Sequence, residues 1–105
     1  MTLNEQVSAA LGKRRIDMVL IGGSAGGVDA LLSLLPSLQP GYTPAVGCIL
    51  QVTGDRESRL AELFDARVML PVREARDKAP IEPGVVYFAG SGYHLSIEQD
   101  RSFSL

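Results

Sequence analysis

The residue with the clearest chemical potential is a serine among small neighbours, in the segment 22–26 with the sequence GGSAG. This segment fits the pattern G-x-S-x-G, which places a serine hydroxyl on a sharp turn between a strand and a helix. Small neighbours let the backbone bend there, and amide groups at the start of the helix can stabilise an oxyanion. We therefore expect Ser24 to be a nucleophile, with Ala25, Gly26 and Gly27 forming the turn and the oxyanion site.

Other interpretations of the same segment stay open. A dinucleotide-binding fingerprint G-x-G-x-x-G would need glycine in place of Ser24, because Gly22 and Gly27 supply only its outer positions. A phosphate-binding loop is excluded, because it would need a lysine directly after Gly27 and Val28 stands there. Ser24 could also be a helix-capping serine in a crowded turn.

A serine nucleophile needs a base, because its hydroxyl reacts poorly at neutral pH. His94 is the single histidine of the chain and follows a predicted strand, so it is a candidate base on the same rim as Ser24. An ordinary turn histidine is the alternative. The carboxylates that could orient the base are Asp55, Asp77 and Glu98, and spacing favours none of them.

The remaining candidates for chemistry are few. Cys48 is the single cysteine and lies in an apolar run, which is typical of a buried core thiol. One histidine, one cysteine and scattered carboxylates make no pattern of metal ligands. We expect no metal and no cofactor.

Composition limits the class of protein. The chain has 105 residues, 46% of them hydrophobic and 21% charged, which fits one small globular domain. Its net charge is −2 and its one basic cluster, at 13–15, is short, so we expect no nucleic-acid partner. No apolar stretch approaches the ~18 residues of a membrane span, and no signal-peptide core is present. We expect a cytoplasmic protein without membrane insertion.

Apolar runs alternate with helical patterns along the chain. The segment 1–15 is expected to be a helix or linker, and 16–105 the domain. The pattern predicts strands over 16–21, 45–50, 69–74 and 85–89, helices over 28–38 and 56–65, and hairpin arms over 95–98 and 102–105. This alternation predicts an α/β fold of three layers, doubly wound around a mainly parallel, Rossmann-like sheet.

The predicted fold ends in a β-hairpin rather than in a closing helix. We therefore expect an incomplete sheet, whose apolar edge leaves self-association open.

Several stretches together resemble one known family. They are VLIGGSAGGVDALLSLLPSL, CILQVTGDRESRLAELFD and VREARDKAPIEPGVVYFAGSGYHLSI. They resemble the catalytic domain of the chemotaxis protein-glutamate methylesterase family, CheB, over 16–105. The resemblance implies signal-transduction hydrolases that act on glutamyl methyl esters, and in many members on glutamines, of the cytoplasmic regions of methylated chemoreceptors.

The resemblance implies that Ser24 is the family's nucleophilic serine and that it attacks the ester to form an acyl-enzyme. The family histidine follows a glutamine at the end of the second strand, where this chain has Val52 after Gln51. The family aspartate lies in a glycine-rich motif beyond the terminal hairpin, past Leu105. The sequence thus leaves two hypotheses, an esterase with Ser24 as nucleophile or a catalytically inactive methylesterase-like binding module or fragment.

Overall fold

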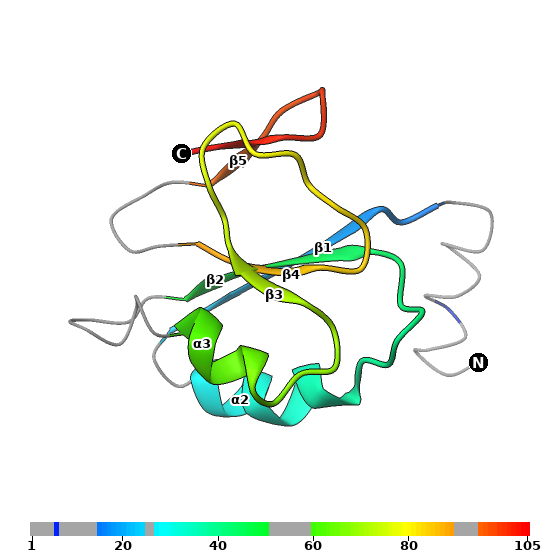
Figure 1. The fold of residues 1–105 in the computed structure, drawn as a ribbon, viewed down its shortest axis with the longest axis vertical. Helices are drawn as coiled ribbons and strands as arrows, with labels where there is room; N and C mark the ends of the chain where they lie inside the picture. Colours follow the sequence, from blue (N-terminus) through cyan, green and yellow to red (C-terminus); the bar gives the residue numbers. More distant parts are fainter. Residues whose placement is uncertain (1–5, 7–14, 25–26, 51–59, 90–94) are drawn as a thin grey trace.

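The computed structural model describes residues 6, 15–24, 27–50, 60–89 and 95–105. Within them the elements follow in this order: β1 (Met18–Gly23), α2 (Gly27–Leu34), the 3-10 helix η1 (Leu35–Ser37), β2 (Ala45–Leu50), α3 (Leu60–Asp65), β3 (Val72–Glu74), β4 (Val86–Phe88), β5 (Ser96–Ile97) and β6 (Phe103–Ser104). Figure 1 shows both helices on one side of the main sheet and the terminal hairpin on the other.

The main sheet has the strand order β1-β2-β4-β3, and every pairing in it is parallel. The connections β1–α2–β2 and β2–α3–β3 run across the sheet in the same direction. Because such crossovers are right-handed, their helices lie on the same face. The connection from β3 back to β4 runs in the opposite direction, and its loop at 75–85 passes over the other face (Figure 1). The predicted α/β class with a mainly parallel sheet is confirmed.

The helix-side core is built from alternate residues of the central strands. Strand side chains alternate between the two faces, so one set from β2 and β4 points toward α2 and α3. The rings of Phe64 in α3 and Phe88 in β4 stack with their centroids 4.8 Å apart. The buried members are Leu31, Leu35, Val46, Cys48, Leu50, Leu60, Phe64, Val68, Leu70, Val86 and Phe88.

A second, smaller core lies on the opposite face, beneath the terminal hairpin. Phe103 of β6 is 1% exposed and meets Tyr87 of β4 edge-to-face at 4.8 Å. Backbone bonds join the hairpin to the 75–85 loop: the Lys78 amide donates to the Phe103 carbonyl at 2.7 Å, and the Phe103 amide donates to the Ala79 carbonyl at 3.0 Å. In the described part of the chain, the third layer is therefore this hairpin and loop.

The predicted boundaries differ from the observed ones where prolines and sheet pairing intervene. The predicted helix 28–38 becomes 3-10 in its last turn, around Pro36, which has no amide to donate. The predicted strand 69–74 begins only at Val72, because Pro71 cannot join the ladder as a donor and Met69 is 64% exposed. The first strand starts two residues later than predicted and continues to Gly23, which pairs with Leu50.

Other predicted elements match more closely. The strand 45–50 has the predicted bounds, and the hairpin forms with antiparallel pairing between β5 and β6. Most of the segment 1–15, which is expected to be a helix or linker, and the start of the helix 56–65 lie outside the described residues. Among the described helices, none has the length and apolar character needed to cross a membrane.

Candidate active site

Ser24 lies directly after the first strand, at the carboxyl edge of the main sheet. The preceding residue, Gly23, pairs with Leu50 at the end of β2, and Ser24 itself is exposed. The amide of Gly27 donates to the Ser24 carbonyl at 2.8 Å, and α2 begins at Gly27. The strand before Ser24 and the helix after it, which the sequence predicts, are therefore present, and the two residues between Ser24 and Gly27 lie outside the described residues.

The glycines that flank Ser24 make room for one leucine. A Cβ atom on Gly23 would lie 3.2 Å from Cδ2 of Leu50, and one on Gly27 would lie 3.0 Å from the same atom. Real Cβ atoms rarely come so close, so the buried Leu50 side chain requires small residues on both sides of the turn. A Cβ atom on Gly22 would meet nothing within 4 Å. Packing therefore explains the glycines at 23 and 27 but not the first glycine of the motif.

The carboxyl ends of the neighbouring strands lie along the same rim as Ser24. Cys48 of β2 pairs with Phe88 of β4, and the amide of Ala89 donates to the Cys48 carbonyl at 3.1 Å. His94 follows β4 by several residues but lies outside the described residues, so its predicted place near Ser24 stays a prediction. Ala25, Gly26, Val52 and Asp55 also lie outside the described part.

The other two candidate carboxylates have roles elsewhere. Oδ1 of Asp77 accepts the backbone N–H of Leu105 at 3.0 Å, which fixes the end of the chain to the 75–85 loop. Glu98 lies in the turn of the hairpin, where its amide donates to the Ser102 carbonyl at 2.9 Å. Loop and hairpin cover the face of the sheet opposite α2, and no described contact joins either carboxylate to Ser24.

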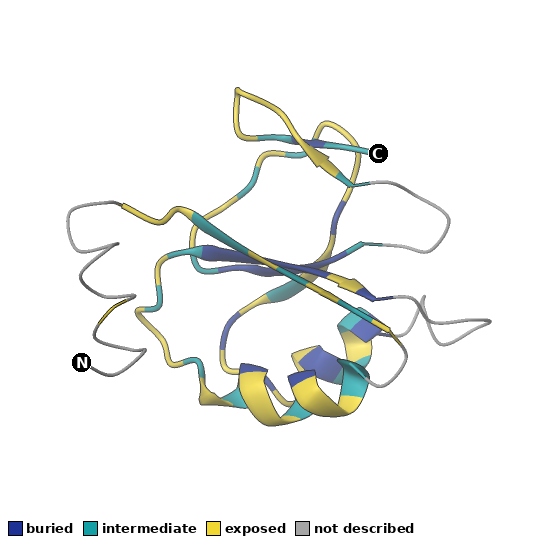
Figure 2. Cartoon of the chain, turned by 180° about the vertical axis from the view of Figure 1, so that it is seen from behind, coloured by how far each residue is buried: buried dark blue, intermediate teal, exposed yellow. Residues whose placement is uncertain are grey.

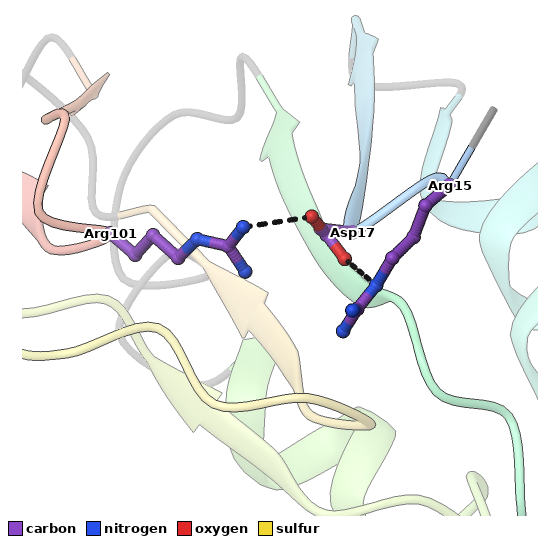
Figure 3. A network of polar contacts seen from close by, with 3 residues as sticks. All are labelled: Arg15, Asp17 and Arg101. Carbon is purple, nitrogen blue, oxygen red and sulfur yellow. Dashed lines mark hydrogen bonds and ion pairs between the residues drawn. The ribbon is translucent and has the colours of Figure 1, made fainter.

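A charged cavity of about 240 Å³ lies at the amino ends of β1 and β2, at the opposite end of these strands from Ser24. Asp17 bridges two arginines there: its Oδ1 lies 2.7 Å from Nε of Arg15, and its Oδ2 lies 3.0 Å from Nη2 of Arg101 (Figure 3). The apolar residues that line the cavity include Ile16, Met18, Ala45, Ile81, Pro83 and Ile97. Sequence reasoning missed this cluster because Asp17 and Arg101 are separated by 84 positions, and no local pattern links them.

The single cysteine is buried in the helix-side core, as the sequence predicts. Cys48 is 0% exposed, and burial raises the pKa of its thiol from 9.0 to about 12. The thiolate is the nucleophilic form of cysteine, so this thiol is inert at neutral pH. Within the described ranges, no three His, Cys, Asp or Glu side chains gather as metal ligands would.

Comparisons with known proteins agree on one family. The family model described as CheB methylesterase matches residues 19–104. A protein-glutamate methylesterase/protein-glutamine glutaminase of Caldanaerobacter subterraneus is 35% identical over 105 residues, covering 96% of this chain and 29% of the relative. A putative protein of the same name from Leptospira interrogans is 30% identical over 88 residues, covering 84% of this chain and 46% of the relative.

A solved structure shares the fold. The crystal structure of the Thermotoga maritima CheB methylesterase catalytic domain matches with a TM-score of 0.77 and 28% identity, over 87% of this chain and 50% of that chain. The chain therefore spans less than half of each of these two curated relatives and half of the solved domain.

Proposed function

Because this chain belongs to the CheB methylesterase family, we propose that it is part of a protein-glutamate methylesterase whose nucleophile is Ser24. Its substrate is a glutamyl methyl ester on another protein. Since the relatives are also named protein-glutamine glutaminases, a glutamine side-chain amide is the second substrate class.

The observation that carries this proposal is the exposed Ser24, which lies between β1 and α2 at the carboxyl edge of the sheet. The amide of Gly27 at the start of α2 donates to the Ser24 carbonyl, and Ser24 is exposed. Its place at the carboxyl edge of a parallel sheet is where α/β proteins bind ligands.

The reaction follows the double displacement of serine hydrolases. The Ser24 oxygen attacks the ester carbonyl while a base takes its proton, and collapse of the tetrahedral intermediate expels the methoxy group, which leaves as methanol after taking that proton. Water then cleaves the acyl-enzyme, which releases the glutamate carboxylate and restores the hydroxyl of Ser24. Backbone amides of Ala25 and Gly26 are the proposed oxyanion donors, because the amide of Gly27 is already bonded to the Ser24 carbonyl.

The proposed base is His94, the single histidine of the chain. It follows β4, which ends on the same rim as β1, and it acts on Ser24 only if its ring comes within ~3 Å of the hydroxyl. No cofactor or metal takes part in the proposed reaction. The proposed partner is the cytoplasmic region of a methylated chemoreceptor, so we propose a cytoplasmic location for this chain.

Labelling with a serine-directed fluorophosphonate, together with methanol release from methylated receptor, tests the proposal. We expect Ser24 to carry the label and Ser24→Ala to lose both signals. Ser33→Ala is the matched control, because Ser33 is an exposed serine of α2 whose hydroxyl donates only to the Asp29 carbonyl, and its variant should behave like the native chain. Label on Ser33, or methanol release that survives Ser24→Ala, would contradict the assignment.

A second candidate function is a methylesterase-like binding module without catalysis. It is favoured by Val52, which stands where the resemblance places the histidine base. Loss of a triad base costs as much rate as loss of the whole triad, on the order of 10⁶-fold. Receptor binding that is equal in the native chain and in Ser24→Ala, with no label and no methanol from either, would identify this second function.

A further inference from the structure

We propose that the charged cavity at the amino ends of β1 and β2 binds a small organic acid, in which one carboxylate is joined to a single apolar ring. The carboxylate binds the guanidiniums of Arg15 and Arg101, and the apolar part packs on the isoleucines that line the cavity. The cavity lies at the opposite end of the strands from Ser24, so this site does not depend on the proposed esterase activity.

Segments that are far apart in the sequence build the cavity and hold it in shape. They are the residues 15–17 before β1, Thr43 before β2, Ile81 and Pro83 of the 75–85 loop, and the hairpin residues Ile97 and Arg101. The Ala45 amide donates to the Asp17 carbonyl at 3.0 Å, and the Ile81 amide donates to the Arg101 carbonyl at 2.8 Å. Because backbone hydrogen bonds fix two sides of the cavity, a ligand has little chain to order when it binds.

The charges that line the cavity favour an anion. Two arginines and one aspartate leave one unit of positive charge in excess, and Asp17 lies between the two guanidiniums (Figure 3). Each arginine meets Asp17 through one nitrogen, Nε of Arg15 and Nη2 of Arg101. A guanidinium carries five N–H donors, so this contact does not exhaust either arginine, and its planar fork matches the geometry of a carboxylate. A ligand with one carboxylate therefore balances the charge.

Arg101 has a backbone conformation that suits glycine better than arginine. Its φ is 64°, in the left-handed region, in the turn between β5 and β6. Glycine usually takes such a position in a hairpin turn, because a larger side chain is strained there. Backbone strain of this kind clusters at ligand sites, where the surrounding structure holds a side chain in place. In this turn the strained residue supplies a guanidinium that lines the cavity.

The size of the cavity and its apolar lining set the rest of the ligand. Ile16 is 42% exposed and Ile97 is 43% exposed, and both line the cavity. Figure 2 shows that the chain is exposed where it enters β1 and at the tip of the hairpin, in contrast to the buried β2 and β4. The volume of about 240 Å³ exceeds the ~150 Å³ of a cavity that holds benzene and is below the ~300–1,000 Å³ of sites for drug-sized ligands. One ring with a short carboxylate arm therefore fits.

Titration of this chain with phenylacetate, followed by amide NMR shifts, tests the proposal. Phenylacetate joins a ring to a carboxylate, and for its roughly ten non-hydrogen atoms we expect a Kd of about 1 mM or below. The shifts should be largest at Ile81 and Ile97 and absent from α2. Benzylamine carries an ammonium group and benzyl alcohol is neutral, so both should bind at least about tenfold more weakly, as expected when a charge-assisted hydrogen bond is lost.

Two variants separate binding from folding. Arg101→Gly should weaken phenylacetate binding by at least about tenfold, and it should fold because glycine adopts the left-handed conformation without strain. Arg101→Gln keeps a polar side chain without the charge and should lose the same affinity. Arg67→Gln is the matched control, because Arg67 is an exposed arginine that follows α3 on the other side of the sheet, and it should bind like the native chain.

Binding is read out directly, so failure of the esterase assay leaves this test intact. The absence of saturable shifts, shifts confined to residues outside the cavity, or binding of benzylamine or benzyl alcohol as tight as that of phenylacetate would each overturn the proposal. Equal binding by Arg101→Gly and the native chain would also overturn it. Circular dichroism of each variant verifies that it is folded.

Discussion

Leu50 of β2 fills the space between the two glycines that flank the candidate nucleophile, and its Cδ2 would lie 3.0 Å from a Cβ atom on Gly27. The contact links the end of one strand to the turn after its neighbour. The geometry of the turn at Ser24 therefore depends on a core residue that carries no chemistry itself.

Gly27→Ala should destabilise the fold. Alanine usually stabilises a helix relative to glycine, but overpacking against Leu50 costs about 1–3 kcal/mol and decides the sign here. Urea unfolding measures the change. Gly22→Ala is the control, since its Cβ would meet no atom within 4 Å, and we expect it to change the free energy of unfolding by less than about 0.5 kcal/mol.

The same contact predicts a rescue. In Gly27→Ala combined with Leu50→Val, the shorter side chain removes the atom that the new Cβ would meet. The losses of unfolding free energy in Gly27→Ala and in Leu50→Val, added together, should then exceed the loss in the double variant, because residues in contact are energetically coupled. If the two changes are strictly additive, the destabilisation by Gly27→Ala does not arise from its contact with Leu50.

Phe103→Ala should release the terminal hairpin from the sheet. Phe103 is 1% exposed and packs on Tyr87, so its truncation should cost about 3–5 kcal/mol in unfolding free energy. Ile97→Ala on the partner strand removes a side chain that is 43% exposed, and it should cost far less. Equally small costs for the two variants would mean that the hairpin contributes little to the stability of the fold.

The Cys48 thiol should make stability fall in alkaline solution. Burial raises its pKa from 9.0 to about 12, so above pH 9.0 the unfolded chain ionises while the native thiol stays protonated. This contribution to stability is complete below pH 9.0 and is lost progressively up to about pH 12. Cys48→Ala should flatten the decline in that window, measured by urea titrations of both chains, and the native thiol should resist iodoacetamide until the chain unfolds.

Asp17→Asn should weaken the attachment of the hairpin to β1 only slightly. Both ion pairs of Asp17 are exposed, and such pairs contribute about 0–1 kcal/mol. The effect should shrink at high salt, where the Debye length falls to about 3 Å. Glu82→Gln, which removes the exposed ion pair between Glu82 and Arg73, is the matched control. If the loss of stability in Asp17→Asn does not depend on salt, an electrostatic cause is excluded.

The sequence predicted the elements whose patterns are local. The strand 45–50 is a continuous apolar run, and its observed bounds agree with the prediction because all of its residues except Ile49 are buried. The strand–turn–helix around Ser24 was predicted because small residues and a leucine-rich helix follow directly in the chain. Whether Ser24 reacts, and whether His94 serves it, stays a prediction.

Features that depend on pairing between distant segments were not predictable. The first strand continues through Gly22 and Gly23, which disfavour strands in isolation, because β2 offers partners for both. The bridge from Asp17 to Arg101 has no local signal at all. The strand order, in which β4 lies between β2 and β3, likewise arises from the order of crossovers, which hydrophobic periodicity does not encode.

The ion pair of Arg101 with Asp17 and the packing of Phe103 on Tyr87 have a consequence for synthesis on the ribosome. The hairpin residues 95–105 cover a face whose strands are synthesised before them. Ser104 at the end of the hairpin follows Phe88 at the end of β4 by 16 residues, so the sheet waits for its cover for about 1–3 s at a synthesis rate of about 5–20 residues per second. During that interval the nascent chain exposes the apolar face beneath the hairpin, which makes it a substrate for chaperones that bind emerging chains.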